Sequence, residues 1–88
     1  MTELKINLES NEDAVIIMLI LEELRAAKVA HPIWPKDNVK RIAIVMEEAG
    51  EAVREANLLD EGKGSVQNLK VELRQTAAMC IRALQELQ

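Results

Sequence analysis

Aromatic residues are almost absent from this chain: Trp34 stands alone, with no phenylalanine and no tyrosine. Because hydrophobic residues still make up 49% of the 88 positions, any core must be aliphatic. Two prolines and three glycines are the only strong helix breakers, and both prolines flank Trp34. Scarce breakers, and no stretch of alternating polar and apolar residues, predict an all-α fold.

Other absences limit the compartment and the partners. A single cysteine, Cys80, excludes an intrachain disulfide and fits a reducing cytoplasm. The net charge of −4 argues against nucleic acid as a partner, because phosphate backbones bind concentrated basic surfaces. The N-terminus "MTELKINLES" is acidic and unlike a signal peptide, and the run "AVIIMLIL" (14–21) is far short of the ~20 residues of a membrane span. We expect a cytoplasmic protein with no membrane partner.

The length leaves room for one domain, residues 1–88, and the breakers divide it into three helices. The residue before a proline is pushed out of the α region, and Asp, Asn and Ser are good N-caps. The predicted helices run from about Asn11, after a Ser10 cap, to Ala30; from an Asp37 or Asn38 cap to Leu59 or Asp60; and from a Ser65 cap close to the C-terminus. Gly62 and Gly64, in the turn "DEGKGS", are free to take positive φ. Only "LKINL" (4–8) is compatible with a short strand.

The first helix predicts an assembly. Its eight consecutive apolar residues, 14–21, are hydrophobic all round, and such a helix must be covered on several sides. Two further helices of one short chain hide only part of that surface. We therefore expect an antiparallel bundle of about three helices, completed by formation of a homodimer or a homotetramer.

Helical periodicity separates an apolar face from an acidic one on the second and third helices. The expected core positions are Ile42, Val45, Met46, Ala49, Val53 and Ala56, and then Leu69, Leu73, Ala77, Cys80, Ile81 and Leu84. Glu48, Glu51 and Glu55 share a neighbouring face with Glu47 at its margin, and Glu72, Gln75 and Met79 share another.

Antiparallel packing of these helices brings Glu48 and Glu51 opposite Glu72 and Gln75. Three carboxylates and an amide oxygen form an all-oxygen site, which suits Mg²⁺, with Mn²⁺ as an alternative. In a chain that is 30% charged, such spacing is more often an ordinary solvated face.

The pattern "EEAGE" at 47–51, followed after twenty residues by "ELRQ" at 72–75, resembles the MazG-like all-α nucleoside triphosphate pyrophosphatases, whose acids follow ExxE, a spacer and ExxD. The lead-in "HPIWPKDN" and the later "QTAAM" look like a compact MazG-like subgroup. The resemblance covers about residues 30–84. It implies a helical dimer or tetramer that binds Mg²⁺ and hydrolyses a (deoxy)nucleoside triphosphate to the monophosphate and pyrophosphate.

The resemblance assigns roles to single residues. Glu48, Glu51 and Glu72 fall on metal-ligand positions, and Gln75 stands where the family has aspartate. Glu47 matches an acid that binds metal or activates the attacking water. Trp34 matches a nucleobase-pocket position, although it fits equally well as a core plug between Pro32 and Pro35.

Three further polar residues are candidates for substrate binding. Lys36 and Asn38 stand at the start of the second helix, where free N–H groups attract phosphate, but such residues more often only cap. Arg74, on the third helix, is placed to approach a triphosphate.

Three functions remain open at this point. The first is the hydrolase. The second is a nucleotide- or metal-binding homologue that has lost turnover, which the Gln75 departure suggests. The third is a helical oligomerisation module without a ligand, which the apolar first helix would serve equally well.

Overall fold

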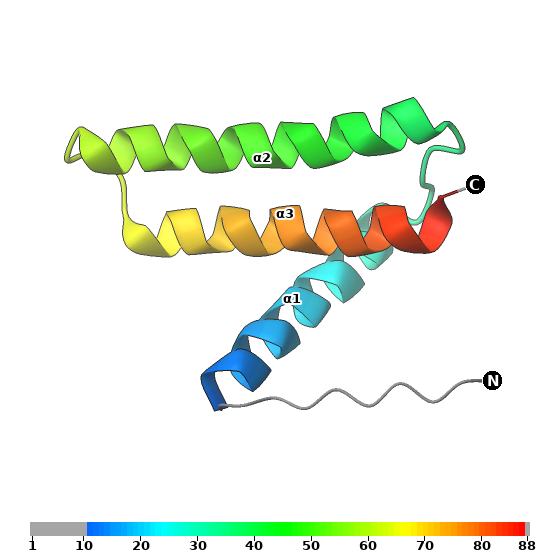
Figure 1. Cartoon of the computed structure of the whole chain (residues 1–88), viewed down its shortest axis with the longest axis horizontal. Helices are drawn as coiled ribbons and strands as arrows, with labels where there is room; N and C mark the ends of the chain where they lie inside the picture. The colour runs from blue at the N-terminus through cyan, green and yellow to red at the C-terminus, as the bar shows by residue number, and fades with distance from the viewer. Residues whose placement is uncertain (1–10, 88) are drawn as a thin grey trace.

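The computed structural model describes residues 11–87, which form three helices and no strand. They are α1 (Asn11–Ala30), α2 (Asn38–Asp60) and α3 (Val66–Glu86), as Figure 1 shows. The all-α prediction is confirmed for this part of the chain, and so are the predicted helix limits. The predicted Ser10 cap and the segment "LKINL" lie outside the described residues.

Side-chain caps start α2 and α3 where the sequence predicts. The Asp37 carboxylate accepts a hydrogen bond from the Val39 N–H at 2.8 Å, and the Ser65 hydroxyl accepts one from the Asn68 N–H at 3.0 Å. These oxygens satisfy N–H groups that have no partner within the helix. The helices therefore begin at defined residues.

The two glycines of the α2–α3 turn have different roles. Gly62 has a φ of 75°, a conformation that favours glycine. Gly64 does not have positive φ. A Cβ at Gly64 would lie 3.0 Å from the Leu59 nitrogen, so close approach to the end of α2 explains this glycine instead.

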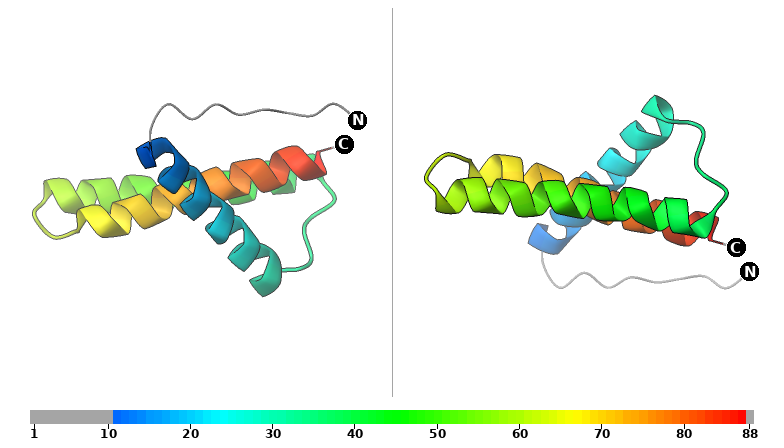
Figure 2. Two further views of the ribbon diagram at one scale, coloured as in Figure 1. Left: turned by 90° about the horizontal axis from the view of Figure 1, so that it is seen from below. Right: turned by 90° about the horizontal axis from the view of Figure 1, so that it is seen from above.

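The three helices are arranged around α3. α2 and α3 lie side by side and antiparallel, as the short turn between them predicts (Figure 1). α1 crosses α3 on the side away from α2, as the two views in Figure 2 show. The core is small: Leu24 of α1 packs with Ala78 and Met79 of α3, and partly buried aliphatic side chains surround them. α3 therefore carries most of the packing.

The predicted core faces of α2 and α3 are wrong in part for the single chain. Val45 and Ile81 pack against the core, and the other half-buried positions among those predicted are Ala49, Ala56, Leu69 and Ala77. Ile42, Met46 and Val53 are 45%, 62% and 61% exposed. On α3, Leu73, Leu84 and Cys80 are also exposed. The buried positions are Arg41 and Ala52 on α2, and Ala78, Met79, Arg82 and Ala83 on α3. Three of these six buried residues are alanines and two are arginines.

The apolar run of α1 is also incompletely covered. Val15, Ile16, Ile17 and Met18 are exposed, because α1 packs against α3 and not against α2. This agrees with the prediction that one chain leaves part of the run uncovered. None of the helices in residues 11–87 has both the length and the hydrophobicity to cross a membrane.

Candidate functional site

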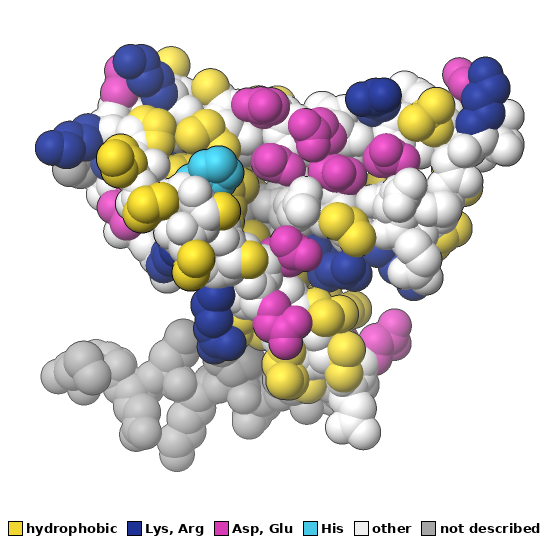
Figure 3. Space-filling view, turned by 180° about the vertical axis from the view of Figure 1, so that it is seen from behind, with side chains coloured by type: hydrophobic (Ala, Val, Ile, Leu, Met, Phe, Trp, Pro, Cys, Tyr) yellow, Lys and Arg dark blue, Asp and Glu magenta, His cyan; other side chains and the backbone are white. Residues whose placement is uncertain are grey.

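Three glutamates from two helices converge on one point. Glu48 and Glu51 are one helical turn apart on α2, and Glu72 comes from the facing side of α3. One carboxylate oxygen of each lies within 4.8 Å of the others. Figure 3 shows acidic side chains gathered over the side of the molecule that is hidden in Figure 1. The predicted convergence of the two helices is therefore present.

The cluster is electrostatically strained without a cation. Burial raises the pKa of Glu48, and the charges of Glu51, Glu47 and Glu23 raise it further. Burial also raises the pKa of Glu72, followed by a hydrogen bond shared with Glu51 and by the charges of Glu51, Glu48 and Glu55. Within residues 11–87 no lysine or arginine forms an ion pair with these acids. The positive charge that would relieve their repulsion is not supplied by these residues.

Unpaired oxygens mark the same place. Oε2 of Glu48 and Oε2 of Glu72 are buried and accept no hydrogen bond. A buried acceptor without a partner is unfavourable by about 1–3 kcal/mol. Carboxylate oxygens that converge, lack a donor and lie partly out of water suit a hard divalent cation such as Mg²⁺. The residues present therefore fit the expected metal.

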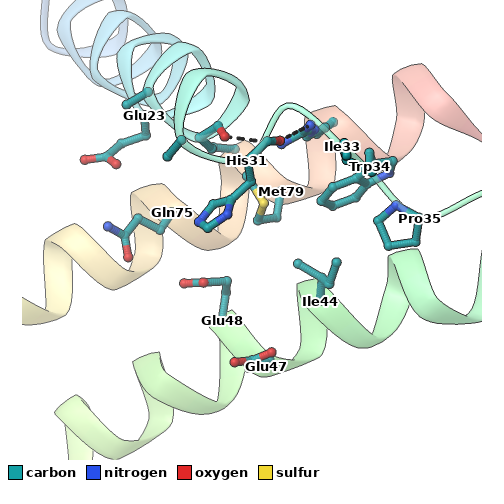
Figure 4. Close-up of a pocket in the computed structure, with 15 residues that line it drawn as sticks. Glu23, His31, Ile33, Trp34, Pro35, Ile44, Glu47, Glu48, Gln75 and Met79 are labelled. Carbon is teal, nitrogen blue, oxygen red and sulfur yellow. Dashed lines mark hydrogen bonds between the residues drawn. The ribbon is translucent and has the colours of Figure 1, made fainter.

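A cavity of about 630 Å³ adjoins the cluster. Figure 4 shows Glu23, Glu47, Glu48 and Gln75 at one end, Trp34 and Pro35 at the other, and His31, Met79 and Ile44 between them. The remaining lining residues are Ala26, Ala27, Ala30, Ile33, Ala78 and Arg82. The cavity thus joins an acidic end to an end with an indole ring and an apolar floor.

Two buried arginines fix the linker between α1 and α2, which forms one wall of the cavity. Arg82, 3% exposed, donates to the His31 carbonyl at 2.7 Å and to the Ala27 carbonyl at 3.4 Å. Its guanidinium also stacks 4.5 Å from the centre of the Trp34 ring. Arg41, 2% exposed, donates to the Pro35 carbonyl at 2.6 Å. The linker is therefore held at both ends, and Trp34 is held over the cavity.

The structure brings some of the predicted site residues together and not others. Glu48, Glu47, Gln75 and Trp34 line the cavity, and Glu51 and Glu72 complete the acidic cluster beside it. Lys36, Asn38 and Arg74 are not among the lining residues. The Asn38 side chain accepts a hydrogen bond from Arg41 at 2.9 Å, which is a structural role at the start of α2.

The Thr76 hydroxyl donates to the Glu72 carbonyl at 2.8 Å, a bond that threonine often forms with the carbonyl four residues earlier in a helix. This bond ties Thr76 to the backbone of the residue that supplies the third carboxylate.

Sequence reasoning missed three cavity residues. Glu23 is on α1, far from the acidic pattern, and it reaches the cavity only because α1 crosses α3. His31, at the start of the linker, also lines the cavity. Nothing in the sequence around Arg82 indicates a cavity residue, except that it lies one turn after Ala78 on α3. The crossing of α1 over α3 brings these three side chains to the cavity, and a local sequence pattern does not predict that crossing.

Comparisons of the chain with models of protein families, with curated proteins and with solved structures give no match. A function for this chain therefore rests on its residue pattern and on the geometry of the site.

Proposed function

We propose that this chain is a Mg²⁺-dependent nucleotide pyrophosphohydrolase of the MazG-like group, which cleaves a (deoxy)nucleoside triphosphate to the monophosphate and pyrophosphate. One observation carries the proposal: the carboxylates of Glu48, Glu51 and Glu72 converge within 4.8 Å beside a cavity of about 630 Å³. A site that binds only a metal ion needs no such cavity. A nucleotide bound through a metal ion would occupy both the acidic cluster and the cavity.

The acidic residues hold the metal in this proposal. Glu48, Glu51 and Glu72 supply carboxylate oxygens, and Gln75 supplies a neutral amide oxygen at the edge of the cavity. When bound, Mg²⁺ or Mn²⁺ neutralises phosphate charge and polarises the phosphoanhydride. The same positive charge relieves the repulsion that raises the pKa of Glu48 and Glu72.

Glu47 and Trp34 take the remaining roles. Glu47 lines the acidic end. We assign its carboxylate to orient a water molecule and accept its proton. Trp34 lines the opposite end, where an indole binds a flat base. In this arrangement the phosphates lie among the glutamates, and the nucleobase lies near the linker. Lys36, Asn38 and Arg74 are not needed for this arrangement.

The proposed assembly is a homodimer or a homotetramer. Ile42, Met46 and Val53 on α2 form an exposed aliphatic stripe, and Leu73 and Leu84 continue the exposed apolar surface on α3. Large apolar patches that stay exposed on a single chain mark interaction surfaces. A second copy of the chain supplies a matching apolar face by symmetry. We place the protein in the cytoplasm, where a free cysteine stays reduced and nucleotides are available.

A screen of nucleoside triphosphates with Mg²⁺ or Mn²⁺, which measures released pyrophosphate, tests the proposal. Turnover that requires the metal and disappears in Glu51→Gln is the expected result. Stabilisation by nucleotide without turnover would instead favour the binding homologue. If no nucleotide is hydrolysed and none stabilises the protein, the remaining hypothesis is the oligomerisation module, which the exposed apolar stripes favour.

A further inference from the structure

The end of the cavity near Trp34 has a hydrogen-bonding character opposite to that of the acidic end. The buried side-chain atoms that remain unpaired there, within residues 11–87, are Nε1 of Trp34 and Nε of Arg82. Both are N–H donors. The nearby carbonyls of His31 and Pro35 already accept hydrogen bonds from Arg82 and Arg41. This end therefore offers donors and a positive charge.

The positive charge of Arg82 has no carboxylate partner. Its guanidinium is buried, contacts two carbonyls and the Trp34 ring, and forms no ion pair within the described part of the chain. A buried donor or charge of this kind favours an electronegative ligand atom and disfavours another donor. Both side chains line the cavity.

We infer that Arg82 and Trp34 read the base of the nucleotide and select an oxo group over an amino group at the edge that meets them. The inference rests on the proposed function, since it assumes a nucleotide in the cavity. A carbonyl oxygen accepts from Arg82 Nε–H or Trp34 Nε1–H. An exocyclic amino group presents N–H to N–H and leaves both donors unpaired.

The consequence is a substrate class. Among the common bases adenine alone has no carbonyl group, so adenosine nucleotides are poor ligands and oxo-bearing bases are good ones. A hydrolase with this preference spares adenosine triphosphate. The apolar floor of Ile44, Ala78 and Met79 accepts any flat ring, so selection comes from the two donors.

Inosine and adenosine nucleotides provide a matched test, because their bases differ at the six position, where inosine has an oxo group. Binding of each monophosphate is measured by calorimetry without metal, and hydrolysis of each triphosphate is measured with Mg²⁺. We expect inosine monophosphate to bind at least about tenfold more tightly, and the triphosphates to show a similar ratio of kcat/KM. Equal affinities, or no binding of either monophosphate, would overturn the inference.

Two variants locate the selection. Trp34→Phe keeps a ring and removes one donor, and Arg82→Lys keeps the charge and removes Nε–H. Each is expected to bring the inosine-to-adenosine ratio towards one. Arg54→Lys, the same change at an exposed position of α2, leaves the ratio unchanged. If Trp34→Phe and Arg82→Lys both keep the inosine-to-adenosine ratio of the parent protein, the role of the donors is refuted. If Arg82→Lys does not fold, the result for Trp34→Phe decides alone.

The two proposals fail separately. If the protein prefers inosine monophosphate but releases no pyrophosphate from any triphosphate, the base selection is supported and the hydrolase activity is refuted. Hydrolysis of inosine and adenosine triphosphates with equal kcat/KM would keep the hydrolase and remove the selection.

Discussion

The two sides of α2 differ in a way that reverses the usual pattern of a helix. Ile42, Met46 and Val53 form an aliphatic stripe that is largely exposed. The side turned to α3 carries Arg41, which is 2% exposed, together with Glu48, which is half-buried. A helix of a soluble protein normally buries its apolar stripe and exposes its charges.

The reversal suggests a separate role for each side of α2. The buried charged side contains the candidate metal ligands and the arginine that holds the linker. Ala52 is also buried on this side of α2. The exposed apolar side has no partner among residues 11–87, and in the proposed assembly a second chain covers it. The proposed site and the proposed interface then occupy different sides of one helix.

The largest predicted effect concerns the acidic side. Glu48→Gln or Glu51→Gln should lower metal-dependent pyrophosphate release by at least about 100-fold, because a ligand charge is lost where phosphate charge must be neutralised. Turnover is measured with saturating Mg²⁺ and nucleotide. Glu22→Gln, an exposed glutamate of α1, serves as the control. If Glu51→Gln turns over at the rate of the control, the cluster is a solvated surface.

The next effect concerns the apolar side. Met46→Lys should raise the dissociation constant of the assembly by about 100-fold or more, since the new charge would be buried without a partner at the interface. Sedimentation across a range of concentrations measures it. Gln67→Lys places the same charge at an exposed polar position of α3 and should leave the assembly intact. Unchanged sedimentation of Met46→Lys would show that this stripe is not the interface.

A smaller effect concerns Gln75. Its amide oxygen is neutral, so the site has one negative charge fewer than a site with aspartate there. Gln75→Asp should tighten Mg²⁺ binding to the free protein by about tenfold, because ligand charge is a main determinant of hard-ion affinity. Calorimetric titration measures this. In the parent protein, nucleotide should raise Mg²⁺ affinity, with the same coupling factor in reverse. Tight Mg²⁺ binding that Gln75→Asp does not change would place Gln75 outside the site.

The smallest effect is on stability without metal. The folded-state pKa values of Glu48 and Glu72 are raised, so folding favours their protonated forms. This contribution is present below the ordinary glutamate pKa of about 4.3, and it is lost as pH rises through the raised values. Glu72→Gln should therefore raise the melting temperature of the metal-free protein at pH 7 by a few degrees and flatten its pH dependence.

Mg²⁺ should stabilise the parent protein at pH 7, because it binds the ionised carboxylates of the folded state. Glu72→Gln should lose most of this stabilisation. Thermal unfolding from pH 4 to pH 8, with and without Mg²⁺, measures both effects. A parent protein whose melting temperature rises steadily over this range without metal would contradict the argument.

The helices were predictable because their limits depend on local chemistry. Asp37 and Ser65 cap the helix starts with their own side chains, and Pro32 follows the end of α1. These interactions span only a few residues, so the sequence contains all that is needed. The role of Gly64 was not predictable, because it depends on how closely the turn approaches Leu59.

The candidate site was predictable in part. The spacing of Glu48 and Glu51 places them one turn apart, and the short turn before α3 brings Glu72 opposite them. Glu23 and Arg82 reach the cavity only through the crossing of α1 over α3. The prediction of the core faces failed in part, because it assumed that the whole of each apolar stripe packs within one chain.

The sequence by itself determined three helices, their limits and the meeting of acids from two of them, since capping, periodicity and a short turn act over a few residues. Only the tertiary structure decided which sides of α2 and α3 meet. Alanines and two arginines are buried in this packing, and much of each aliphatic stripe stays exposed. The same packing joined the acids to Trp34 and Arg82 in one cavity, because it depends on contacts between residues far apart in the chain.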